Sequence, residues 1–191
     1  MGLGADFSRI LEQYSDPQAQ AAPQGVESQQ VEQDFDHVAQ GTDVETLQHG
    51  IDGAFRSEQT PPFGNMVGQM FGGADPNQRA GMLNQLIGAV GPAVIGSLLG
   101  GSNAAGGGLG GMLGGLLGNG GAAAPQISPQ QAQQLDPQQV QEIASHAERE
   151  NPGVVQQMSR YYAQNPQLFK ALGGAALAVA LGHIAQRNRQ G

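Results

Sequence analysis

Large apolar side chains recur every three or four residues along most of this chain, which is the spacing of one face of an α-helix. The first stripe consists of Phe7, Ile10, Leu11 and Tyr14. Further stripes lie within residues 31–38, 44–55, 63–71, 82–99, 140–161 and 168–184. No segment of strand length alternates convincingly between apolar and polar positions. The pattern therefore predicts an all-α protein.

Proline follows a polar residue at several points, and most of these pairs precede an apolar stripe. An Asp, Asn, Ser or Thr side chain accepts hydrogen bonds from the first turn of a helix. Proline at the next position lacks the N–H group that this turn leaves unpaired. We therefore expect short helices that each begin at their own cap. The pairs are Asp16-Pro17, Thr60-Pro61, Asp75-Pro76, Ser128-Pro129, Asp136-Pro137, Asn151-Pro152 and Asn165-Pro166.

Three further signals set helix boundaries. Thr42 and Glu45 have the spacing of a capping box, which predicts a helix start at Thr42. Gly91-Pro92 interrupts the stripe of residues 82–99 and predicts a break between two helices. The stripe of residues 168–184 predicts one final helix.

These signals divide the chain into five segments. We expect an N-terminal amphipathic helix over 1–15, a flexible linker over 16–30 and an acidic-to-neutral helical domain over 31–101. A Gly/Leu-rich segment over 102–127 and a C-terminal helical domain over 128–191 follow. The expected architecture is a small bundle of short Pro-capped helices with Gly-rich and Gln/Pro-rich flexible linkers.

The Gly/Leu-rich segment has two registers that match a helix. Its large apolar residues are spaced by three and four, and glycines recur every fourth residue at 106, 110, 114 and 118. As a helix, the segment would present an apolar face and a face of bare backbone that another helix could approach closely. Four interior glycines destabilise an isolated helix by about 3–4 kcal/mol. Such a helix needs a partner surface or a lipid phase.

The surrounding sequence is uncharged from residue 80 to residue 135. Its apolar run over 86–101 is shorter than the roughly 20 residues that a membrane-spanning helix needs. We favour buried helices of a soluble bundle, with peripheral membrane contact or a single spanning helix as alternatives. The candidate interaction residues are Leu86, Ile87, Val94, Ile95, Leu98, Leu99, Leu109, Met112, Leu113, Leu116 and Leu117.

Charge and composition narrow the classes of partner. Residues 1–60 carry eleven acidic and two basic side chains, whereas residues 61–191 carry five acidic and six basic ones. An acidic chain without a basic patch does not match a nucleic-acid partner. The absence of cysteine excludes disulfides and thiolate sites. The N-terminus lacks a basic region followed by an apolar run, so we expect no cleaved secretory signal.

No residue pattern predicts catalysis, a cofactor or a metal site. His49 follows Glu45 by four residues and His146 precedes Glu150 by four, but a zinc site needs more ligands than this. The glycine tract lacks the strand, helix and acidic residue of a dinucleotide site. Arg160, Tyr161 and Tyr162 could form a small recognition patch, although a core position is the commoner explanation for paired tyrosines.

Residues 44–118 resemble a family of small bacterial proteins grouped around YidB. The similarity lies in AFRSEQTPPFGNMVGQMFG, the following DPNQRAGMLNQLIGAVGP and the GGMLGGLLG tract. It implies a small, largely helical bacterial protein with no assigned catalytic residues. The acidic N-terminal extension and the Gln-rich C-terminal part depart from that family's shorter pattern.

Two functional hypotheses follow. The first is a non-enzymatic helical interaction or scaffold protein of the bacterial cytoplasm, which forms a homo-oligomer or binds another helical protein through residues 80–118. The second is an exported, membrane-active protein that inserts the same region and is secreted without a cleaved signal or associates with membranes. The second hypothesis rests on composition, because harpins are similarly acidic, rich in Gly and Gln, poor in aromatic residues and free of cysteine.

Overall fold

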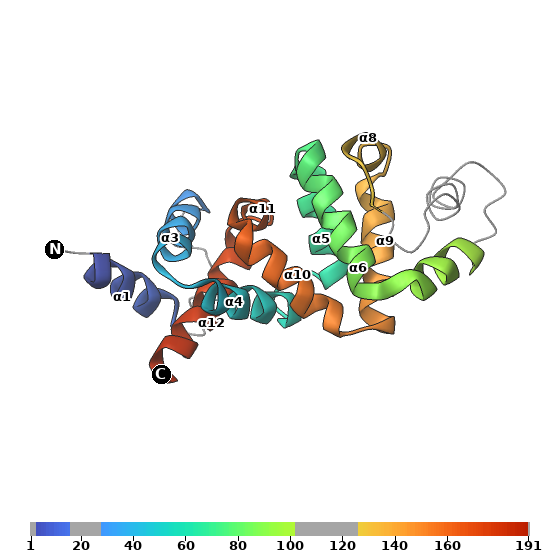
Figure 1. Cartoon of the computed structure of the whole chain (residues 1–191). Helices are drawn as coiled ribbons and strands as arrows, with labels where there is room; N and C mark the ends of the chain where they lie inside the picture. The colour runs from blue at the N-terminus through green and yellow to red at the C-terminus, as the bar shows by residue number, and fades with distance from the viewer. Residues whose placement is uncertain (1–2, 16–27, 102–125, 191) are drawn as a thin grey trace.

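The computed structural model describes residues 3–15, 28–101 and 126–190, and it describes side chains over 8–15, 29–89 and 126–189. Every regular element in these ranges is an α-helix, which confirms the predicted all-α class. The helices form two groups, and one helix, α10 (Gly153–Gln164), lies between them (Figure 1).

The first group surrounds the C-terminal helix α12 (Gly174–Gln190). This helix packs against α1, α3 and α4, and α11 contacts both α3 and α12. The bounds of these four helices are Leu3–Tyr14 for α1, Ser28–Gly41 for α3, Val44–Arg56 for α4 and Pro166–Lys170 for α11. The group therefore brings the two ends of the chain together.

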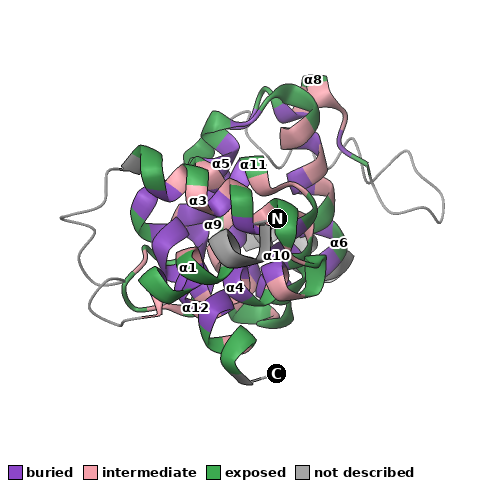
Figure 2. Ribbon diagram, turned by 90° about the vertical axis from the view of Figure 1, so that its left-hand side faces the viewer, coloured by how far each residue is buried: buried purple, intermediate pink, exposed green. Residues whose placement is uncertain are grey.

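The second group is built on the pairing of α5 (Phe63–Gly73) with α9 (Pro137–Glu150). Helix α6 (Pro76–Gly101) packs against α9 and against the short helix α8 (Pro129–Ala132). Each group thus combines helices from the predicted segment 31–101 with helices from the predicted segment 128–191. The buried side chains of both groups form one continuous core, which Figure 2 shows in purple on the inward faces.

Aromatic rings join the two groups. The Phe55 ring on α4 lies 5.2 Å from Phe63 on α5, and 5.7 Å each from Tyr162 on α10 and Phe169 on α11, measured between centroids. Phe169 also lies 5.7 Å from Phe35 on α3. All five side chains are buried. The few aromatic residues of this chain are therefore concentrated where five helices meet.

Several helices begin at the predicted caps. Asp75 Oδ1 accepts from the backbone of Asn77 and Gln78, and α8 and α9 begin with capping boxes at Ser128 and Asp136. The predicted cap at Thr42 is wrong by one residue. Asp43 is the N-cap of α4, because its carboxylate accepts from the Thr46 N–H at 2.8 Å.

Two helix boundaries also differ from the prediction. The helix does not end at Gly91-Pro92, since α6 continues to Gly101, although Figure 1 shows its second half leaving the bundle in a different direction. The Asn151 side-chain amide donates to the Ala89 carbonyl at 2.9 Å. This carbonyl is next to that of Gly88, which loses its helical donor because Pro92 has no N–H. Conversely, the predicted final helix is two helices, because Gly173 has a φ of 81° between α11 and α12.

Glycines let the helices of both groups approach closely. On α5, a Cβ atom at Gly68 would lie 2.8 Å from the Pro137 carbonyl oxygen of α9, and one at Gly64 would collide with Ser145. On α4, a Cβ at Gly50 would lie 2.8 Å from the Ala180 carbonyl oxygen of α12. The α5–α9 and α4–α12 crossings therefore depend on the missing side chains.

We expect Gly68→Ala to lower the free energy of unfolding by about 2 kcal/mol, because the added methyl group would push α5 away from α9. The matched control is Gly88→Ala in α6, where an added Cβ would meet no described atom within 4 Å. This control should gain about 0.5–1 kcal/mol from helix propensity. Urea denaturation of both variants measures the difference, and equal effects would contradict the close-approach interpretation.

One buried polar atom lacks a partner among the described residues. The Tyr162 hydroxyl is fully enclosed and makes no hydrogen bond with them. Burial raises the pKa of this phenol well above 10, with a smaller contribution from Tyr161. Such a hydroxyl costs free energy because it leaves its water partners without gaining others.

We therefore expect Tyr162→Phe to raise the free energy of unfolding by about 1 kcal/mol. The control is Tyr14→Phe, which removes the 2.9 Å hydrogen bond to Asp34 and should have the opposite sign. Thermal or urea denaturation of the two variants tests this. A destabilised Tyr162→Phe variant would show that the hydroxyl is hydrogen-bonded after all.

Candidate functional site

The predicted interaction residues fall in three structural classes. Leu86 and Ile87 are 1% and 7% exposed and belong to the core of this chain, where α6 meets its neighbours. Val94, Ile95, Leu98 and Leu99 lie on the second half of α6, for which only the backbone is described. The remaining candidates, Leu109, Met112, Leu113, Leu116 and Leu117, lie outside the described residues. The side chains of Leu86 and Ile87 are thus already covered by other helices of this chain.

The return of the chain to the bundle is held by a polar side chain of α6. Asn84 Nδ2 donates to the Ile127 carbonyl at 3.1 Å, and the Ile127 N–H donates to Asn84 Oδ1 at 2.6 Å. These two bonds imitate a backbone pairing and fix Ile127, which is 5% exposed, against the helix. The sequence pattern gave no sign of this contact, because Asn84 looks like an ordinary polar flank of an apolar stripe.

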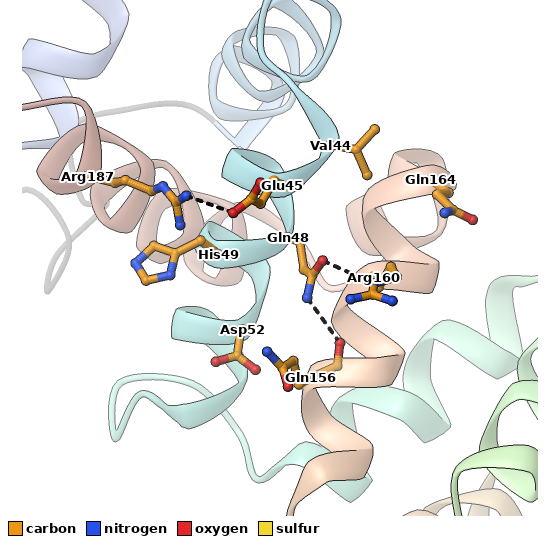
Figure 3. Close-up of a pocket in the computed structure, with 9 residues that line it drawn as sticks. All are labelled: Val44, Glu45, Gln48, His49, Asp52, Gln156, Arg160, Gln164 and Arg187. Carbon is orange, nitrogen blue, oxygen red and sulfur yellow. Dashed lines mark hydrogen bonds and ion pairs between the residues drawn. The ribbon is translucent and has the colours of Figure 1, made fainter. Parts of the chain in front are cut away.

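A polar cavity of about 440 Å³ opens on the outer surface between α4 and α10. Helix α4 contributes a stripe of five residues, helix α10 a stripe of three, and α12 contributes Arg187 (Figure 3). The stripes are Val44, Glu45, Gln48, His49 and Asp52 on α4, and Gln156, Arg160 and Gln164 on α10. Because both stripes follow helical spacing, the cavity is a groove that runs along the two helices.

Weak polar contacts cross this groove. Gln48 Nε2 donates to the Gln156 carbonyl and Arg160 Nε donates to Gln48 Oε1, both at the long distance of 3.5 Å. Arg187 Nη2 lies 3.2 Å from Glu45 Oε1, in an ion pair whose side chains are 40% and 81% exposed. An ion pair this exposed contributes little to stability. The groove side chains are therefore free to exchange these partners for a ligand.

Arg187 also borders a second cavity of about 380 Å³, which begins where α3 ends and α4 begins. Thr42, Asp43 and Thr46 line one side, and Ile184 and Asn188 of α12 line the other. The Glu45–Arg187 pair thus stands between two hollows on the same face of the molecule.

The histidines do not gather into a metal site. Among the described residues, no group of three or more His, Asp and Glu side chains is placed to hold a metal ion. His183 of α12 is instead packed against α4, where a Cβ at Gly53 would lie 2.5 Å from its Cγ. Burial of the ring lowers the pKa of His183 below 6.5. The charge of His49 adds to this, and Asp52 opposes it.

The proposed patch of Arg160, Tyr161 and Tyr162 is divided by the fold. Tyr162 is buried in the aromatic cluster, and Tyr161 is half-buried against α6, with its hydroxyl facing Gly81. Arg160 alone points into the groove (Figure 3). Its i±4 neighbours Gln156 and Gln164 are also exposed and extend the polar stripe on α10, which in the sequence looks like an ordinary solvated helix face.

We expect acid to weaken the contact between α4 and α12. A histidine whose pKa is lowered by folding stabilises the folded state above its ordinary pKa of 6.5, and this contribution is lost as the pH falls through the lower folded value. Urea midpoints of the wild-type protein should therefore decline between about pH 7.5 and pH 5. His183→Gln should reduce this decline, whereas the same change at the exposed His37 of α3 should leave it unaltered. Equal slopes for all three proteins would contradict the assignment.

In the part of the chain that the structure describes, the helices are too short or too polar to cross a membrane. No family model, curated protein or solved structure matches the chain. The similarity to YidB-like proteins therefore stays a prediction based on residues 44–118.

Proposed function

We propose that this chain is a non-enzymatic helical interaction protein that self-associates through its uncharged middle, residues 80–118. The observation that carries the proposal is the construction of α6. This helix is anchored in the bundle at one end and continues through an uncharged sequence to Gly101 at the other.

The anchored half is fixed by packing. Met82, Leu83 and Leu86 are each 1% exposed, and α6 contacts α8, α9 and α10. Beyond Ala89 the helix has no charged residue, and its sequence retains apolar positions at helical spacing. A helix without a charged face is ordinarily covered by another surface. A second copy of the same helix is the simplest cover, because the interface is then the same patch on both chains.

The described helices supply a precedent for the glycine tract. Gly64, Gly68 and Gly72 recur every fourth residue on α5, and this glycine face lies directly on α9. The same four-residue spacing recurs at 106, 110, 114 and 118 in the sequence. A tract with this spacing is suited to close contact with another helix, which supports association of chains through residues 106–118.

Removal of residues 80–118 would destroy the core, so we expect a more selective variant to be informative. Leu109, Leu113, Leu116 and Leu117 are changed together to Gln in the full chain. Sedimentation velocity should then show an oligomer for the wild type and a monomer for the variant, with unchanged helical circular dichroism. The matched control changes the same four leucines to Met, which keeps the apolar surface and should keep the oligomer.

Flotation with vesicles of phosphatidylcholine and phosphatidylglycerol separates the alternatives. A monodisperse oligomer that stays at the bottom of the gradient supports the proposal. Flotation that is lost in the Gln variant and kept in the Met control would favour the membrane-active hypothesis instead. A wild-type monomer that ignores vesicles would contradict both.

A further inference from the structure

The groove between α4 and α10 is a second surface, independent of the uncharged middle. Its stripe on α4 runs from Val44 to Asp52, and these two residues lie eight positions apart, which corresponds to roughly 12 Å of helix. This length matches three or four residues of extended polypeptide. Val44 lies at one end of the groove. Its exposed fraction is 48%, and among the described residues it is the large apolar residue that is exposed to solvent.

The charges that line the groove leave one cation unmatched. Asp52 is paired with Arg56 at 2.9 Å, and Glu45 is paired with Arg187 at 3.2 Å. Arg160 has no carboxylate partner among the described residues, and its hydrogen bond to Gln48 is 3.5 Å long. The complementary ligand therefore carries one negative charge rather than several.

Glutamine amides provide the remaining polar contacts. Gln48 faces Gln156 across the groove, and Gln164 lies one turn beyond Arg160 (Figure 3). Each amide side chain offers both a donor and an acceptor, as peptide backbone N–H and C=O groups require. A simple inorganic anion would use the guanidinium but leave these acceptors and the exposed valine without a role.

We propose that this groove binds a short extended peptide segment that carries one carboxylate beside an aliphatic residue. The carboxylate pairs with Arg160, the backbone of the peptide bonds the groove glutamines, and the aliphatic side chain covers Val44. The exposed Glu45–Arg187 pair borders the site and opens without a large cost, so that the peptide can extend toward the second cavity.

The experiment is a nuclear magnetic resonance titration of ¹⁵N-labelled full-length protein. It monitors the backbone amide signals of Gln48, Gln156 and Arg160. The ligand is the capped tetrapeptide acetyl-Gln-Leu-Glu-Ala-amide, and its partner peptide has Gln in place of Glu. We expect saturable shifts with the acidic peptide and binding weaker by a factor of about five with the neutral one, which is the upper range for one exposed charge pair. Salt should reduce this difference.

Two variants that each lose one positive charge test whether Arg160 is the residue that pairs with the peptide carboxylate. Arg160→Gln should remove the preference for the acidic peptide. Arg149→Gln, on the exposed surface of α9 outside the groove, should retain it.

The proposal is overturned if the groove signals do not move at about 10 mM peptide. It is also overturned if both peptides bind equally, if the two variants behave alike, or if sodium acetate alone reproduces the shifts. Because the Leu→Gln variant of the glycine tract leaves the groove intact, it should still bind the acidic peptide. Failure of self-association and failure of peptide binding are therefore separate results.

Discussion

Two close helix crossings, which glycine residues make possible, determine most of this structure. At the α5–α9 and α4–α12 crossings, backbone carbonyl oxygens occupy the space that a Cβ atom would need. Each crossing joins residues that are separated by more than sixty positions in the chain, so these contacts connect the N-terminal and C-terminal halves. Dispersion contacts weaken quickly with distance, and a bundle of small side chains therefore gains most from helices that lie close together.

This packing suits a chain with few large side chains. Only six Phe and three Tyr are available, and Trp is absent. Phe55, Phe63, Tyr162 and Phe169 meet where the two helix groups join, so the bulkiest residues fill the junction that α10 alone would not close. Apart from the aromatic residues, the core depends on Leu, Val, Ile, Met and Ala, whose smaller volume is compensated by the short distance between helices.

The sequence predicted the helices better than their partners. Apolar spacing identified the helical class, and the Asp75, Ser128 and Asp136 caps were predicted correctly because a cap is a local hydrogen-bond pattern. The errors at Pro92 and Gly173 arose where a helix changes direction without ending and where a single φ angle ends a helix. The α4–α10 groove could not be predicted, since its two stripes lie about 110 residues apart and each resembles an ordinary solvated face.

Asn84 and Asn151 have a consequence for how this chain can vary. Asn84 holds Ile127 against α6, and Asn151 bonds Ala89, five residues further along the same helix. The chain between Ala89 and Ile127 is thus held at both of its ends by contacts with α6. The two α6 residues concerned, Asn84 and Ala89, lie about one and a half helical turns apart. Insertions or deletions between residues 102 and 125 would leave the register of the described packed helices unchanged. Related proteins can therefore differ widely in the length of this stretch while they retain the same bundle.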